Sequence, residues 1–185
     1  LADRSVLITG GAGFIGNQLV EELSGANEVI VLDDCSTGCP ERLPPDVQLL
    51  RRDISESDAF ARTPSDIGIV YHLAANVSVD RSFAEPIWSH SVNVTGTLSA
   101  LEFAKAHNAR LVFASSAAVY GMPDNVPISE DAPPEPCSPY GAEKLAAEHY
   151  VRLYNQLYDI ETVGLRLFNV YGPGQPPNAS AGVIT

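Results

Sequence analysis

A tyrosine and a lysine four residues apart, Tyr140 and Lys144, form a pair that could transfer a proton. Four residues along a helix make about one turn, so both side chains would lie on the same face. A tyrosine ordinarily has a pKa near ~10, which is too high for a base at neutral pH. Because a nearby ammonium group favours the phenolate, we expect Lys144 to lower the pKa of Tyr140 toward the working range.

The residues just before this pair predict the start of a helix. Ser138 is a natural N-cap, and Pro139 suits the first helical position, where no amide hydrogen is needed. Tyrosine and lysine also share solvated helix faces in many proteins, so the pair needs support from the rest of the chain.

Short apolar runs alternate with helical patterns along the sequence. The expected strands cover residues 6–8, 29–32, 47–50, 67–73, 111–114 and 163–168. Helical periodicity runs from Phe14 to near Gly25, and a long helix is expected from about Pro86 to His107. Uniformly apolar strands that alternate with helices predict an α/β fold, in which a doubly wound parallel sheet is covered on both faces.

Four glycines lie where the first strand turns into the first helix. Gly11, Gly13 and Gly16 match the pattern G-x-G-x-x-G, and Gly10, Gly13 and Gly16 match G-x-x-G-x-x-G. Glycines here permit a tight turn, a close approach of backbone to a pyrophosphate, and close packing of helix on strand. The N-terminus of the helix then offers N–H groups and a positive dipole to the phosphates.

An acidic residue stands at the position that a dinucleotide-binding unit requires. Asp33 ends the second predicted strand, 22 residues after Gly11, close to the ~20 expected for a carboxylate on the adenosine ribose. A carboxylate there repels a 2′-phosphate, so the sequence favours NAD over NADP.

The composition excludes several classes of function. The chain has 185 residues, is 45% hydrophobic and carries a net charge of −12, which argues against sequence-independent binding of nucleic acid. No apolar run is long enough to span a membrane. The three cysteines and four histidines lack the spacing of a metal site, and the odd cysteine count predicts a reduced, cytoplasmic setting.

With these residues placed, the chain resembles the extended short-chain dehydrogenase/reductase family, and within it the nucleotide-sugar epimerases of the UDP-glucose 4-epimerase type. The resemblance covers essentially the whole chain. Its motifs are residues 9–16, 32–33, 53–54, 72–75, 93–97, 115–121, 138–144 and 165–172. Their joint order and spacing are specific, although each motif alone is modest evidence.

The resemblance implies a catalytic role for Tyr140 as acid and base. Lys144 would bond the nicotinamide ribose and depress the pKa of the tyrosine. The catalytic hydroxyl would be Ser116, 24 residues before Tyr140, where it can donate to the sugar oxygen. Ser115 is the alternative, and either serine could instead be a buried structural hydroxyl.

The resemblance also implies which residues hold NAD and the substrate. Asp53 would accept from the adenine amino group, and Asn93 lies in a helix that asparagine does not favour, which indicates a specific bond. The implied cofactor-binding residues are Gly10, Gly13, Phe14, Ile15, Gly16, Asp33, Asp53, Ile54, Leu73, Ala74, Ala75, Asn93, Tyr140 and Lys144. The implied substrate-binding residues are Ser116, Ala117, Tyr140 and Asn169.

The activity that the resemblance implies is epimerisation of a nucleotide-sugar, of the UDP-glucose and UDP-galactose type, at carbon 4. A 4,6-dehydratase or decarboxylase is the alternative within the family, but it needs an acidic residue where this chain has Ala117 and Ala118. A non-catalytic NAD-binding protein is the alternative outside enzymes.

The domain organisation follows from the same resemblance. Residues 1–168 would form a Rossmann NAD-binding domain, and residues 169–185 only the start of a C-terminal substrate-binding lobe. Family members also commonly pair through their long helices, so a homodimer is expected. The residues that could lie at its interface are Leu98, Leu101, Leu145 and Val151.

Overall fold

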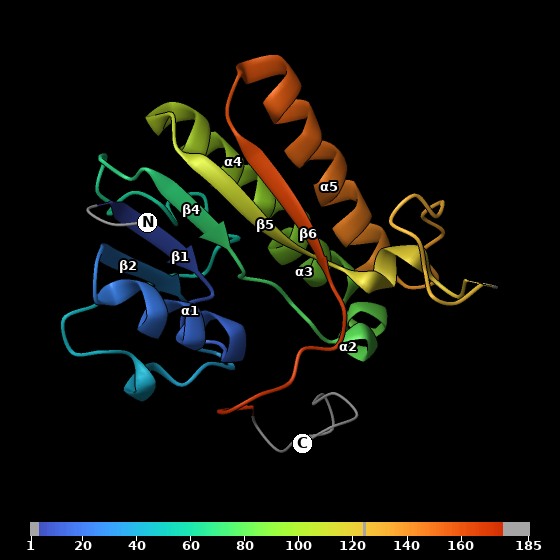
Figure 1. Cartoon of the computed structure of the whole chain (residues 1–185), viewed down its shortest axis with the longest axis horizontal. Coiled ribbons are helices and arrows are strands. Elements are labelled where there is room, and N and C mark those ends of the chain that lie inside the picture. Colours follow the sequence, from blue (N-terminus) through green and yellow to red (C-terminus); the bar gives the residue numbers. More distant parts are fainter. Residues whose placement is uncertain (1–3, 124, 176–185) are drawn as a thin grey trace.

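The computed structural model describes residues 4–123 and 125–175, and over these residues six parallel strands form one sheet (Figure 1). The strands are β1 (Ser5–Thr9), β2 (Glu28–Asp33), β3 (Gln48–Arg51), β4 (Ile69–His72), β5 (Arg110–Ser116) and β6 (Thr162–Leu167). Their order is β3-β2-β1-β4-β5-β6, so the direction of winding reverses between β1 and β4. This arrangement confirms the doubly wound α/β prediction and places a ligand-binding edge at the carboxyl ends of the strands.

The helices confirm most of the expected pattern, but the long helix expected over 86–107 is divided into shorter segments. The helices are α1 (Phe14–Ser24), α2 (Val79–Ala84), α3 (Pro86–His90), α4 (Gly96–His107) and α5 (Pro139–Tyr158). The long helix expected over 86–107 is interrupted by η2 (Ser91–Thr95), a π-helical turn. Two short 3₁₀ turns, η1 (Pro40–Arg42) and η3 (Ala117–Tyr120), complete the set, and α2 was not expected from the sequence.

Two hydrophobic cores lie on the two faces of the sheet, and β1 contributes side chains to both. Leu7 packs into the larger core, which α4 and α5 cover. Val6 and Ile8 point to the opposite face and pack with Val20 of α1. Figure 1 shows α1 on one side of the sheet and α4 and α5 on the other. Alternation with a period of two therefore serves both layers from a single apolar strand.

Two residues that were expected at a dimer interface belong to the core instead. Leu101 is 0% exposed and Val151 is 4% exposed, and both pack in the larger cluster. Their side chains face the sheet because α4 and α5 cover β4, β5 and β6. The prediction that these two residues contact a partner is wrong, whereas Leu98 and Leu145 are only half-buried.

The chain after β6 turns back across the carboxyl edge of the sheet (Figure 1). Arg42 donates from Nη1 to the carbonyl oxygen of Gly174 at 2.7 Å, which joins two segments 132 residues apart. This segment thus passes close to the start of α1. Within the described part of the chain, no helix has the length and apolar character needed to cross a membrane.

Candidate active site

The glycine turn between β1 and α1 has the close contacts that its sequence predicted. Gly10 has φ +72°, and a Cβ added there would lie 2.6 Å from the backbone nitrogen of Ala74. A Cβ on Gly16 would lie 2.2 Å from the carbonyl oxygen of Gly10. Gly10 therefore makes the turn, and Gly16 allows α1 to pack against it.

The N-terminus of α1 is available to an anion. Gly13 is its N-cap, no side chain caps the helix, and its first turn contains no acidic residue. Phe14 and Ile15, which form that turn, are half-buried and exposed. The first N–H groups of a helix have no partner within it, so this end can bind phosphate.

Asp33 lies at the carboxyl end of β2, beside the glycine turn. One of its carboxylate oxygens accepts from the backbone N–H of Ala12 at 3.0 Å, and the other from that of Cys35 at 2.8 Å. Burial raises the pKa of Asp33, and the two backbone hydrogen bonds lower it in part. Each oxygen keeps a further lone pair, so the carboxylate can also accept from a ribose hydroxyl.

Asp53 and Ile54, expected beside the adenine, follow β3. The Asp53 side chain accepts from the backbone N–H of Ser55 at 2.8 Å and from its hydroxyl at 2.7 Å, as in an Asx turn. Ile54 is buried and packs against Gly96, where an added Cβ would lie 2.8 Å from its side chain. A contact of either residue with adenine stays a prediction.

Residues 73–75 form a loop directly beside the glycine turn. The N–H of Leu73 donates to the carbonyl of Thr9 at 3.0 Å, and that of Ala74 to the Thr9 hydroxyl at 3.3 Å. Leu73, Ala74 and Ala75 are half-buried. Because the loop lies at the switch point between β1 and β4, its small side chains can line a cofactor cleft.

His72, the residue before this loop, connects β1 to α4. Its Nδ1 lies 2.7 Å from the hydroxyl of Thr9, and its Nε2 lies 3.0 Å from that of Thr97. Burial, assisted by the charge of Lys144, lowers the pKa of His72 to about 3. The imidazole is therefore neutral and structural, as expected from the sequence.

The two serines at the end of β5 point in different directions. Ser115 donates its hydroxyl hydrogen to Glu148 of α5 at 2.5 Å, and Glu148 also pairs with Arg166 of β6. The Ser116 hydroxyl accepts from the N–H of Ala118 at 3.1 Å. It also lies close enough to the phenol of Tyr140 to lower the pKa of that group. Of the two candidates, only Ser116 adjoins the tyrosine, and Ala117 follows it in η3.

Tyr140 is held at the start of α5 by two serines. The Ser138 hydroxyl accepts from the N–H of Gly141 at 3.1 Å, which confirms the predicted N-cap. Ser82 of α2 accepts from the backbone N–H of Tyr140 at 3.1 Å. The predicted helix start is thus correct, and α2 supplies a support that the sequence did not indicate.

The expected lowering of the Tyr140 pKa is wrong for the protein's own groups. Burial raises the pKa of Tyr140, the Ser116 hydroxyl lowers it in part, and the charge of Glu143 raises it further. Lys144 instead donates from Nζ to the carbonyl oxygen of Ala114 at 2.8 Å and lies 4.8 Å from the centre of the Phe113 ring. Its ammonium group binds the end of β5 rather than the phenol.

Lys144 is almost completely buried, with 3% of its surface exposed. Burial lowers its pKa to about 8, and the charge of Glu143 opposes that change. The lysine therefore stays largely charged at neutral pH, and its bond to Ala114 joins α5 to the strand that carries Ser116.

Asn93 and Asn169, two further expected contacts, lie in different surroundings. Asn93, in η2, is buried and bonds specific partners as expected, but these are Asn76 and Glu143. Asn169 follows β6 and is exposed. Roles in binding the cofactor and the substrate stay predictions for both. Sequence reasoning gave Glu143 no role, since a glutamate on a helix is ordinarily solvated.

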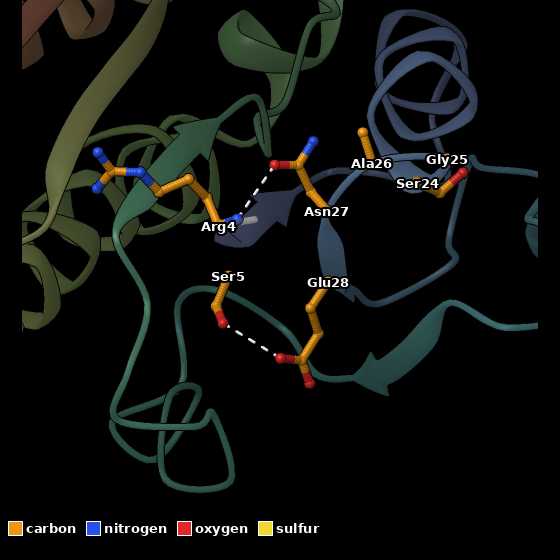
Figure 2. A pocket seen from close by; sticks show the side chains of 7 residues that line it. All are labelled: Arg4, Ser5, Ser24, Gly25, Ala26, Asn27 and Glu28. Carbon is orange, nitrogen blue, oxygen red and sulfur yellow. Dashed lines mark hydrogen bonds between the residues drawn. The ribbon is translucent and has the colours of Figure 1, made fainter. Parts of the chain in front are cut away.

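A hollow lies away from these residues (Figure 2). It is lined by Arg4, Ser5, Ser24, Gly25, Ala26, Asn27 and Glu28. Ser5 and Glu28 begin β1 and β2, so the hollow lies at the amino ends of the strands. Ligands of open α/β sheets bind at the carboxyl ends, where the glycine turn, Ser116 and the Tyr140 helix are gathered.

Comparison with known proteins agrees with this geometry. Residues 6–185 match the NAD dependent epimerase/dehydratase family. The UDP-glucose 4-epimerase of Mycolicibacterium smegmatis is 39% identical over 187 residues, covering 96% of this chain and 60% of that protein. The chain thus spans about three fifths of that relative's length.

Solved structures give the same result. The UDP-glucose 4-epimerase of Thermus thermophilus, in complex with NAD, is 41% identical with a TM-score of 0.88, over 94% of this chain and 58% of that one. A UDP-N-acetylglucosamine 4-epimerase from Methanobrevibacter ruminantium, in complex with UDP-N-acetylmuramic acid, is 36% identical with a TM-score of 0.91. The match covers 97% of this chain and 59% of that one.

A dTDP-glucose 4,6-dehydratase from Streptomyces venezuelae is also similar. It is 34% identical with a TM-score of 0.85, over 91% of this chain and 57% of that one. From the matched family, the identity to its members and the shared fold, this chain belongs to the NAD-dependent epimerase/dehydratase family.

Proposed function

We propose that the protein epimerises a nucleotide-sugar, of the UDP-glucose and UDP-galactose type, at carbon 4 through a 4-keto sugar. The observation that carries this proposal is the closeness of Ser116, at the end of β5, to Tyr140, at the start of α5, with Lys144 of α5 bonded to β5. A hydroxyl and a phenol so placed can hold and deprotonate one carbinol of a sugar.

Each residue has a defined part in the reaction. Tyr140 would take the proton from the sugar 4-hydroxyl while Ser116 donates a hydrogen bond to the same oxygen. Because the protein's own groups raise the pKa of the phenol, the positive nicotinamide ring of the oxidised cofactor would be the group that favours the phenolate. NAD, held at the carboxyl edge of the sheet, would supply the reversible hydride transfer at carbon 4 that links the two epimers through the keto sugar. Tyr140 then gives the proton back, so the reaction is redox-neutral.

The residues that would hold NAD fit that group. The uncapped N-terminus of α1 suits its pyrophosphate, and Asp33 suits a ribose hydroxyl. A Cβ on Gly10 would clash with the backbone of Ala74, so the glycine turn and the 73–75 loop pack directly together at the switch point. The other residues proposed to contact the cofactor are Phe14, Ile15, Asp53, Ile54, Leu73, Ala75, Asn93 and Lys144.

The similarity to a dehydratase makes elimination the second candidate. That reaction also needs a group that moves a proton at carbon 5. Here Ala117 and Ala118 follow Ser116 in η3, and neither can transfer a proton. We therefore favour epimerisation.

We also propose the larger organisation of the protein. Residues 1–168 are assigned to NAD binding, and residues 169–185 to the start of a substrate-binding lobe that includes Asn169, although 176–185 lie outside the described residues. Two copies are proposed to pair through one face of α5, where apolar side chains remain exposed at Tyr150, Leu153, Leu157 and Tyr158. A monomeric mass in light scattering at micromolar concentration would contradict the pairing.

A reducing, cytoplasmic setting is proposed as well, supported by Cys35, Cys39 and Cys137 being free thiols. Recovery of the native protein in a secreted or membrane fraction would contradict it.

The test of the activity uses the complete gene product with NAD, assayed on UDP-glucose and on UDP-N-acetylglucosamine. Tyr140→Phe is expected to lose about 10²-fold or more of the turnover while still binding NAD, because only the proton transfer is removed. Tyr71→Phe, at a half-buried tyrosine of β4 that packs against the core on the α1 face, is the matched control. Near-normal turnover in Tyr140→Phe would refute the assignment.

The reaction product separates the alternatives. An epimerase yields the 4-epimer, whereas a dehydratase releases a keto sugar that has lost water. Tight NAD binding without turnover of any nucleotide-sugar would favour the non-catalytic protein.

A further inference from the structure

In the sequence, Glu143 lies between Tyr140 and Lys144, the two residues of the proton-transfer pair, yet the proposed mechanism gives it no part. Only 6% of its surface is exposed. Carboxylates are almost never buried to this degree unless hydrogen-bonded or paired, because burial removes the charge from water. Its environment therefore needs an explanation.

The Glu143 carboxylate has two short hydrogen bonds from neutral donors. Its Oε2 accepts from the hydroxyl of Ser89 in α3 at 2.7 Å and from Nδ2 of Asn93 in η2 at 2.6 Å. Hydrogen bonds to an ionised acceptor are shorter and stronger than those between neutral groups. The carboxylate thus joins α5 to two other elements.

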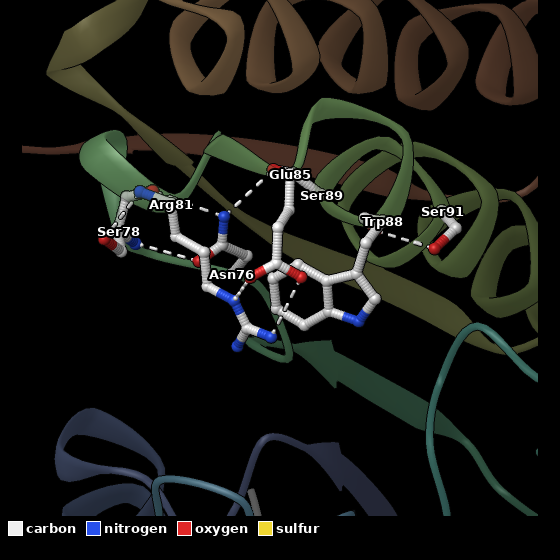
Figure 3. A network of polar contacts seen from close by, with 7 residues as sticks. All are labelled: Asn76, Ser78, Arg81, Glu85, Trp88, Ser89 and Ser91. Atoms are coloured by element: carbon white, nitrogen blue, oxygen red, sulfur yellow. Dashed lines mark hydrogen bonds and ion pairs between the residues drawn. The ribbon is translucent and has the colours of Figure 1, made fainter. Parts of the chain in front are cut away.

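These bonds close into a ring through Asn76. The backbone N–H of Asn76 donates to Asn93 Oδ1 at 2.8 Å, and Asn93 Nδ2 donates to the Asn76 carbonyl at 3.1 Å. The Asn76 side chain donates to the Ser89 hydroxyl at 2.9 Å, a contact that Figure 3 shows. Asn76 directly follows Leu73, Ala74 and Ala75, so the ring connects the loop beside the glycine turn to the helix of Tyr140.

The charge of Glu143 acts on both members of the pair. It raises the pKa of Tyr140 and opposes the lowering that burial imposes on Lys144. From the other elements packed here, Ser89 and Asn93 face the carboxylate and do not titrate. The charge of Lys144 helps burial to lower the pKa of His72 in β4, so this histidine is neutral near pH 7.

We propose, on the basis of the proposed function, that Glu143 is a positioning residue for the proton-transfer pair. Its buried carboxylate fixes the 73–76 loop against α5, the helix that carries both residues of the pair.

Glu143→Gln separates charge from shape. The amide oxygen can still accept from Ser89 and Asn93, whereas the negative charge is lost. Without that charge the pKa values of Tyr140 and Lys144 both fall, so both limbs of the kcat profile should move to lower pH. A purely structural lesion would lower the rate without moving both limbs in one direction.

A second measurement needs no turnover. The phenolate absorbance of the NAD-loaded protein is titrated against pH, and the same titration in a Tyr140→Phe background isolates Tyr140. The midpoint should be lower in Glu143→Gln than in the unsubstituted protein and unchanged in Glu22→Gln, an exposed glutamate on α1. An unchanged midpoint in Glu143→Gln would overturn the proposal, even if the protein proved not to be an epimerase.

The positioning itself is tested by exchanging the amide and the carboxylate. Asn93→Asp places two carboxylates in contact and should weaken NAD binding about tenfold or more, since the ring opens beside the 73–75 loop. Combining it with Glu143→Gln restores an amide–carboxylate pair between these two side chains, although the Asn76 carbonyl still lacks its donor, so the double variant should recover the part of the loss that comes from the repulsion between carboxylates. A double variant no better than Asn93→Asp alone would overturn the positioning role.

Discussion

Replacing Gly16 by alanine tests how closely α1 must lie against the glycine turn. An added Cβ would lie 2.2 Å from the carbonyl oxygen of Gly10 and 2.6 Å from the Cα of Gly11. Both atoms belong to the backbone of a turn that is itself packed against the 73–75 loop and Val31, so they cannot move independently. The helix must therefore shift away from the strand.

The size of the effect follows from two opposing contributions. Alanine gains about 1 kcal/mol over glycine inside a helix. Overpacking costs about 1–3 kcal/mol, and a contact this short places the cost at the upper end. We expect a net loss of about 2 kcal/mol in the free energy of unfolding, or roughly 4–8 °C in Tm for a protein of this length.

Gly25→Ala is the matched control at the other end of the same helix. Gly25 has φ −68° and ψ −18°, and a Cβ there would meet nothing within 4 Å. Alanine should therefore be neutral or stabilise the protein by about 0.4–1 kcal/mol. The measurement is urea unfolding of both variants, together with NAD affinity, which should fall only in Gly16→Ala as the phosphate-binding end of α1 moves. Equal unfolding midpoints for the two variants would refute the close-packing argument.

Two further predictions concern titratable groups that are buried or partly buried. Arg166→Leu leaves the partly buried carboxylate of Glu148 with Ser115 as its remaining partner. We therefore expect the free energy of unfolding, measured in urea, to fall by about 1–3 kcal/mol. An unchanged unfolding midpoint would contradict a structural role for this ion pair. His72 resists protonation down to a pKa of about 3, whereas the unfolded chain protonates it near 6.5. As the pH falls from about 6.5 to about 3, the free energy of unfolding should therefore fall by about 1.4 kcal/mol per pH unit. His72→Gln should remove this part of the pH dependence.

Much of the fold could be predicted because its signals are local. Apolar runs gave the strands, the glycines gave the turn before α1, and Ser138 with Pro139 gave the start of α5. Each of these depends on residues within a few positions of one another. The location of the site at the carboxyl edge then follows from parallel topology alone.

What the sequence could not supply are properties set by distant partners. Lys144 binds the carbonyl of Ala114, 30 residues earlier, so its charge is not directed at Tyr140 and the expected pKa change was wrong. The resemblance favoured Ser116 over Ser115, but only the packing of β5 shows that Ser115 faces Glu148 and Ser116 the phenol. The π-helical turn that interrupts the 86–107 helix likewise contains Asn93, whose partners Asn76 and Glu143 are distant in sequence.

That interruption has a consequence for insertions and deletions. A π-helical turn contains one residue more than the α-helix that would replace it. Deleting a single residue from 91–95 would join α3 and α4 into one regular helix and rotate one half by about 100° relative to the other. Asn93 and Thr97 could then no longer both reach their partners on Asn76 and His72. A shorter chain with a more regular helix would thus lose contacts that the π-helical turn makes possible.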